Sequence, residues 1–212
     1  MDYIDIINSE YFKQTYSKIE ELKKDYSVNH GFIHITNVIE NAKNIATTFN
    51  LDDRQKNLLL IAAALHDIGY LNGKDNHAYN GSIIAKDILK KWKFANEDIV
   101  IISNAIKNHG GKNDYEYIDI ISACLIIADK IDFINTRYDK NKLEESKIKI
   151  FPNITKTYVD YINNEIILNI AINNEFSISL FENSNYYKKL INFLNLLSKR
   201  FNASFKIKYI HI

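Results

Sequence analysis

The chain has 212 residues, with 27 basic and 26 acidic side chains and a formal charge of +1. This balance excludes bulk electrostatic capture of nucleic acid or of a membrane surface as the main function. A hydrophobic content of 46%, with 14 tyrosines and 11 phenylalanines, excludes general disorder. The single Cys124 cannot form an internal disulfide, and the first residues lack the basic and apolar pattern of a signal peptide. We therefore expect an unprocessed, cytoplasmic protein.

The first 150 residues contain no proline and carry apolar side chains at three- and four-residue spacing, which favours successive helices over an all-β fold. The predicted helices span residues 9–26, 34–49, 52–68, 78–92, 96–108, 117–136 and 140–148. The third, capped by Asp52 or Asp53, contains the run NLLLIAAALHDIG, which is apolar on nearly every side. We expect this helix at the centre of a bundle of six or seven helices.

The pattern changes after Pro152, the only proline. Two β-prone segments, ITKTYVDYI and EIILNIAI, flank Asn163 and Asn164, which favour a tight turn because asparagine tolerates positive φ. An amphipathic helix from about residue 185 to 201 and an alternating final segment, SFKIKYIHI, follow. We predict a mainly α fold, with a helical domain over residues 1–150 and a small α+β unit of β-β-α-β order over residues 151–212.

Two acidic side chains are predicted to face the interior of the helical bundle. Asp67 and its neighbour His66 end the most apolar helix, and Asp129 follows apolar residues three and four positions earlier. A buried carboxylate is unfavourable by several kcal/mol unless it is paired. Lys130 is expected to neutralise Asp129 poorly, because adjacent helical residues point about 100° apart. A divalent cation with imidazole ligands would satisfy both aspartates.

Three further histidines lie at predicted helix ends: His34 at the start of one helix, His77 at the start of another and His109 at the end of a third. Each one alone is more often a hydrogen-bonded core residue or a helix cap than a metal ligand. Together with the His66-Asp67 pair and Asp129, they favour a shared metal centre, because helix ends converge in a bundle. His30 and His211 fit no part of this pattern and are expected to be ordinary surface or structural residues.

The order H…HD…H…H…D resembles the HD-domain superfamily of metal-dependent phosphohydrolases. The resemblance covers residues 28–136 and includes HDIG at a helix end, HxxxGS at 77–82 and IADKID at 127–132. It implies a helical bundle in which His34, His66, Asp67 and Asp129 hold a divalent metal. His77 and His109 match the extra histidines of members with two ions, so the resemblance favours a binuclear site bridged by Asp67.

The resemblance also implies a reaction, in which metal-activated water attacks a phosphate ester or anhydride. The mixed imidazole and carboxylate ligands suit Fe or Mn best, with Co, Ni and Mg as further candidates. Lys74 and Lys130 are candidate phosphate contacts. Many family members carry lysine where this chain has Tyr70, and the HD-x-x-E-D and GYP motifs of alarmone and cyclic dinucleotide hydrolases are absent. We expect a small phosphorylated, nucleotide-like substrate.

A second hypothesis is a metal- or nucleotide-binding regulatory module whose C-terminal unit binds a partner. The final strand could pair with the same strand of a second copy, which would form a homodimer. Neither hypothesis includes a membrane or an extended nucleic acid as partner. Closed structural metal sites do not need so many ligands, and this favours the enzyme.

Overall fold

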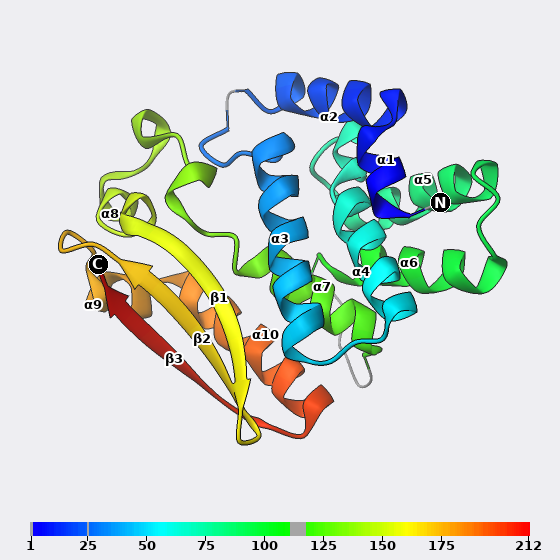
Figure 1. Ribbon diagram of the computed structural model, residues 1–212. Coiled ribbons are helices and arrows are strands. Elements are labelled where there is room, and N and C mark those ends of the chain that lie inside the picture. Colours follow the sequence, from blue (N-terminus) through cyan, green and yellow to red (C-terminus); the bar gives the residue numbers. More distant parts are fainter. Residues whose placement is uncertain (1, 25, 111–117) are drawn as a thin grey trace.

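A computed structural model describes residues 2–24, 26–110 and 118–212, and it divides into a helical bundle and a small sheet (Figure 1). The longer helices of the bundle are α2 (Glu10–Leu22), α3 (Phe32–Thr48), α4 (Asp53–Leu65), α5 (His77–Lys91), α6 (Asn96–Asn108) and α7 (Ile120–Lys130). The mainly α fold with a small C-terminal sheet is therefore confirmed.

Helix α4 lies at the centre of the bundle, as the sequence predicts. Asp52 accepts a hydrogen bond from the Gln55 amide and completes a capping box with the Gln55 side chain. This cap starts the helix. All eight residues from Leu58 to Leu65 are buried, which requires neighbouring helices on every side. The helix ends at Leu65 with His66 as its C-cap, and a short 3₁₀ helix, η1 (Ile68–Asn72), follows Asp67.

The predicted helix over 9–26 corresponds to α2, which starts at Glu10 as expected but already ends at Leu22, and a helix that was not predicted precedes it. Residues 3–8 form a separate helix, α1 (Tyr3–Asn8), because the Asp2 side chain accepts hydrogen bonds from the Ile4 and Asp5 amides. Ser9 then interrupts the helical backbone and caps α2 through its side chain. Two strong caps within eight residues therefore separate two helices.

The predicted helices over 117–136 and 140–148 are shorter than expected. Residue 117 lies outside the described residues, and α7 ends at Lys130. The Thr157 hydroxyl donates to the Ile131 carbonyl at 2.6 Å, so a residue of the sheet takes the acceptor that further helix would use. The 140–148 region is not one helix; it divides into η3 (Lys140–Lys142) and α8 (Glu145–Ile148), after η2 (Asn135–Arg137).

The C-terminal elements match the predicted β-β-α-β order. After η4 (Phe151–Asn153) come β1 (Ile154–Ile162), β2 (Glu165–Ile172), α9 (Ile178–Glu182), α10 (Asn185–Phe201) and β3 (Ser204–His211). Strand β2 pairs antiparallel with β1 and parallel with β3, so α10 is the crossover helix between parallel strands. Figure 1 shows this sheet at one end of the molecule, beside α3.

The sheet is bonded to the helical bundle. The Thr48 hydroxyl of α3 donates to the Val159 carbonyl at 3.2 Å, and the Val159 amide donates to the Asn44 side chain at 3.3 Å. One hydrophobic cluster includes Ile45 of the bundle and Ile166 of the sheet. The division at residue 150 and the homodimer stay predictions. In the described parts of the chain, no helix combines the length and the apolar character that a membrane span needs.

Cys124 provides a probe of this core. Its side chain is fully buried in α7, and burial raises the pKa of the thiol to about 12. Since the thiolate is the reactive form, we expect no reaction with a thiol reagent at pH 8 in the folded protein and one thiol per chain after unfolding in urea. Absorbance with Ellman's reagent measures this, and rapid labelling without urea would contradict the buried position.

Candidate metal centre

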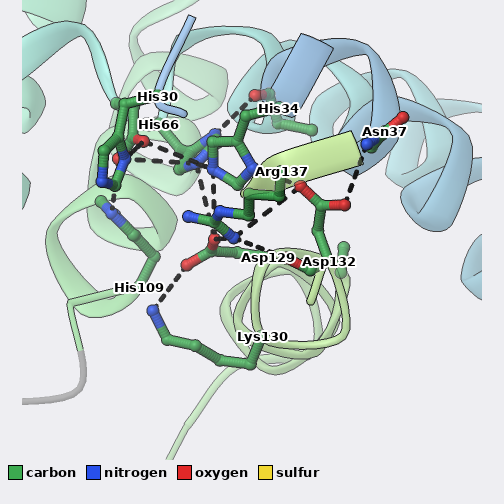
Figure 2. A network of polar contacts seen from close by, with 12 residues as sticks. His30, His34, Asn37, His66, His109, Asp129, Lys130, Asp132 and Arg137 are labelled. Carbon is green, nitrogen blue, oxygen red and sulfur yellow. Dashed lines mark hydrogen bonds and ion pairs between the residues drawn. The ribbon is translucent and has the colours of Figure 1, made fainter. Parts of the chain in front are cut away.

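The six predicted metal ligands lie at the ends of five elements that meet inside the bundle. His34 lies in the first turn of α3, His66 and Asp67 follow α4, His77 begins α5, His109 follows α6, and Asp129 lies at the end of α7. Figure 2 shows His34, His66 and His109 around Asp129. All six are buried except His77, which is partly exposed. The structure brings together all six residues that the sequence singles out.

The imidazole rings are oriented by oxygen atoms on their Nδ1 sides. In each ring the Nδ1–H donates a hydrogen bond: His34 to the Asp132 carboxylate (2.6 Å), His66 to the Ala63 carbonyl (2.8 Å), His77 to the Lys74 carbonyl (3.0 Å) and His109 to the Ile106 carbonyl (2.6 Å). A carbonyl or carboxylate can only accept, so this fixes the proton on Nδ1. When these rings are neutral, they present four Nε2 lone pairs, the form in which imidazole binds metal.

The two oxygens of Asp67 face different histidines. Oδ2 lies 2.9 Å from His30 Nδ1 and 3.4 Å from His34 Nε2. Oδ1 lies 3.4 Å from His109 Nε2, 3.5 Å from His66 Nε2 and 3.8 Å from His77 Nε2. Because each oxygen faces the Nε2 atom of at least one candidate ligand, the carboxylate lies where it could bridge two ions.

The distances between ligand atoms are compatible with bound cations. His34 Nε2 lies 3.2 Å from His66 Nε2 and 3.4 Å from Asp129 Oδ1. Two atoms that are each about 2.1 Å from one ion are at most about 4.2 Å apart. The buried Nε2 of His109 makes no hydrogen bond to any described residue. When lone pairs of imidazole nitrogens and carboxylate oxygens face one another in a buried site, a bound cation can satisfy them.

The electrostatic environment also favours a cation. Burial lowers the pKa of His66 to about 3, so this ring is neutral. Burial would raise the pKa of the Asp67 carboxyl, but the surrounding histidines, His66 first, hold it well below its usual range. At His34, burial and Arg137 lower the pKa, but hydrogen bonds to carboxylates raise it to about 10. The surrounding carboxylates thus favour positive charge at His34 Nε2, from a proton or from a metal ion.

The expectation for Lys130 is wrong. Its Nζ lies 2.6 Å from Asp129 Oδ2 and pairs with that carboxylate, although the two residues are adjacent in α7. The long, flexible lysine side chain bends back around the helix end, which a comparison of Cβ directions does not capture. Since Oδ1 of Asp129 faces His34 and His66, one oxygen pairs with the lysine and the other remains available to a metal.

The other predicted phosphate contact, Lys74, is exposed. Its Nζ lies 5.8 Å from the centre of the Tyr26 ring, and its carbonyl orients His77. Its role in phosphate binding stays a prediction. Tyr70 packs beside the histidines, because its ring stacks on His77 at 4.4 Å and lies 4.4 Å from His30.

Three residues of the centre were missed or misassigned from the sequence. His30, expected to lie outside the pattern, donates from Nδ1 to Asp67. Asp132 accepts from His34, and the Arg137 Nη1 lies 3.7 Å from Asp129 Oδ1. The four-residue spacing from His30 to His34 and the three-residue spacing from Asp129 to Asp132 are local signals that could have found the first two. Arg137 has no such signal.

Two pockets adjoin the centre. One, of about 290 Å³, is lined by His30 together with Lys23, Lys24 and Lys142. The other pocket, of about 270 Å³, reaches Asp129 and Lys130. Its wall also contains three aromatic side chains, Tyr138, Phe151 and Tyr186, of which Phe151 and Tyr186 belong to the C-terminal elements. Arg137 lines both pockets. Cationic and aromatic groups therefore border the candidate metal ligands.

Comparisons with known proteins agree with the resemblance. Residues 31–134 match the family model of the HD domain. A solved structure described as a predicted HD superfamily hydrolase, from an uncultured Thermotogales bacterium, is 26% identical, covering 63% of this chain and 75% of that chain with a TM-score of 0.46. No curated protein matches the chain. By this family match, residues 31–134 form a domain of the HD-domain superfamily, whose members bind divalent metals and are generally metal-dependent hydrolases.

Proposed function

We propose that this protein is a metal-dependent phosphohydrolase that cleaves a phosphate ester or anhydride of a nucleotide-like small molecule. The observation that carries the proposal is the convergence of four histidine Nε2 atoms on the carboxylates of Asp67 and Asp129, next to cationic side chains. When bound, divalent ions lower the pKa of water and neutralise phosphoryl oxygens. Fe and Mn suit the mixed nitrogen and oxygen ligands best, with Co, Ni and Mg as further candidates.

The charges of the centre support an anionic substrate only together with metal. Three carboxylates, those of Asp67, Asp129 and Asp132, lie beside two cationic side chains, Lys130 and Arg137. With neutral histidines, the form that binds metal, these five side chains sum to one net negative charge. One divalent ion reverses the sign, and a second ion increases the positive charge. Because the whole chain is nearly neutral, the attraction for phosphate comes from the centre itself.

The protein's own residues then have separable roles. His34, His66 and Asp129 would hold one ion, His77 and His109 a second, and Asp67 would bridge them. Asp132 orients His34, and His30 orients Asp67, through hydrogen bonds that fix their lone pairs. The ammonium group of Lys130 lies at the border of the aromatic pocket and would contact a phosphoryl oxygen there; Lys74 is a second, more distant candidate.

The hydrolysis assay uses protein loaded with Mn²⁺ or Fe²⁺ and three substrate groups: an aryl phosphate, a bis-aryl phosphodiester and a panel of nucleotides. We expect release of phosphate or of the aryl alcohol from at least one group. Chelation should stop the reaction, and renewed Mn²⁺ should restore it. A fully metal-loaded protein that hydrolyses none of these compounds would contradict the proposal and favour the regulatory module.

The number of ions is tested with His109→Ala. We expect the metal content to fall from about two ions per chain toward one, because His109 lies only on the Oδ1 side of Asp67. Elemental analysis after gel filtration measures this content. His211→Ala, at the exposed end of β3, is the matched control and should keep the wild-type content. A wild-type content near one that His109→Ala leaves unchanged would contradict the second ion.

A further inference from the structure

Arg137 is a buried cation with unused hydrogen-bonding capacity. It exposes only 9% of its surface and ends the short helix η2. Burial lowers the pKa of its guanidinium, but Asp129 and Asp132 raise it, and the net shift is upward. The group is therefore charged at every pH at which the protein is folded.

One donor of the guanidinium has no partner in the described parts of the chain. Nη1 donates to the Asp132 carbonyl at 2.9 Å and lies 3.7 and 3.8 Å from the Asp129 and Asp132 carboxylates. The buried Nε makes no hydrogen bond to any described residue. An unpaired buried donor on a charged group is unfavourable. A purely structural role would leave this donor unexplained.

Arg137 borders the two pockets beside the metal centre. Both pockets include it in their walls. The second pocket is also lined by Asp129 and Lys130 and by the aromatic rings of Phe151 and Tyr186. Figure 2 shows the guanidinium beside Asp129, between His34 and Asp132.

We propose that the guanidinium of Arg137 binds a phosphoryl group of the substrate, while the aromatic pocket takes the substrate's organic part. The planar guanidinium donates two parallel hydrogen bonds to phosphate oxygens, which lysine cannot reproduce. The proposal rests on the proposed function and adds to it the residue that selects a phosphorylated organic molecule. It also gives the C-terminal elements a role, because Phe151 and Tyr186 form part of the pocket wall.

The test measures binding of inorganic phosphate to Mn²⁺-loaded protein by calorimetry, with elemental analysis of every variant. We expect Arg137→Met to raise the phosphate Kd at least tenfold, because two hydrogen bonds to a charged group are lost. Arg137→Lys keeps the charge beside Asp129 and should raise the Kd by a smaller factor. Arg54→Met, at an exposed arginine paired with Asp98, is the matched control and should leave the Kd unchanged.

The outcomes separate this proposal from the proposed function. If Arg137→Met loses its metal, Arg137→Lys decides: a Kd within twofold of wild type overturns the role of Arg137, whereas a clear increase supports it. We expect wild type to bind adenosine monophosphate more tightly than inorganic phosphate, and the same variants to lose affinity for it. If phosphate binding depends on Arg137 but metal-loaded protein hydrolyses nothing, the proposed function fails and the anion site stands. If metal-loaded protein hydrolyses a substrate but the Arg137 variants keep the wild-type phosphate Kd, the proposed function stands and the role of Arg137 is overturned.

Discussion

Asp67→Ala should abolish both metal binding and hydrolysis, the largest effect expected of any single substitution in this protein. Among the described residues, only Asp67 has a carboxylate with histidines beside both of its oxygens, at distances of 2.9 to 3.8 Å. No other described side chain can replace it as a bridge. Since loss of an outer-shell partner already reduces metal affinity or activity 10–100-fold, we expect a reduction greater than about 100-fold. Elemental analysis and the hydrolysis assay measure the two effects.

Asp67→Asn separates the charge from the shape of this side chain. Its amide can donate to the unpartnered Nε2 of His109, so the variant should fold without added metal. Wild-type protein should be stabilised by about 2.7 kcal/mol when free Mn²⁺ is 100 times its Kd, and the variant should gain nothing. Thermal unfolding with and without Mn²⁺ measures this gain. Equal stabilisation of both proteins would contradict the role of the carboxylate, and the exposed Asp53→Asn is the control.

Gly69→Ala should disrupt the contact between η1 and α5. A Cβ atom at Gly69 would lie 1.9 Å from the His77 carbonyl oxygen and 2.5 Å from the Gly81 amide nitrogen. Both neighbours are backbone atoms and cannot rotate away, so η1 has to move from α5. We expect a loss of about 3 kcal/mol or more in the free energy of unfolding. Because His77 belongs to the same contact, the second ion should be lost too.

Gly81→Ala, on the other side of this contact, is the matched control. There the nearest atoms would lie 3.2 and 3.3 Å from the new Cβ, a contact that small shifts relieve. The replacement also favours the helix by about 1 kcal/mol. We expect a change within about 1 kcal/mol in urea unfolding. Similar losses in both variants would show that the close approach at Gly69 is not the cause.

The parts of the fold that the sequence predicts best depend on local signals. Asn163 and Asn164 adopt φ values of 49° and 62°, as the turn requires, and strands β1 and β2 begin and end where the β-prone segments do. The end of α7 is different. It depends on Thr157, whose hydroxyl donates a hydrogen bond to the carbonyl of Ile131, 26 residues earlier in the chain. Periodicity within one segment carries no information on such a contact.

The same distinction applies to the metal centre. The six candidate ligand positions follow from residue type, helix ends and the order of a family motif, all of which are readable along the chain. The supporting contacts join distant segments: His34 to Asp132 across 98 residues and His30 to Asp67 across 37. Lys130 was misjudged for another reason, because its flexible side chain adopts a rotamer that helix geometry does not fix.

Anomalous X-ray diffraction from crystals grown with Mn²⁺ tests the central claim most directly, because it locates ions without depending on turnover. We expect two anomalous peaks, one on each side of the Asp67 carboxylate: one among His34, His66 and Asp129, the other beside His77 and His109. A crystal with Mn²⁺ elsewhere on the surface, but with no peak among these side chains, would contradict the metal centre.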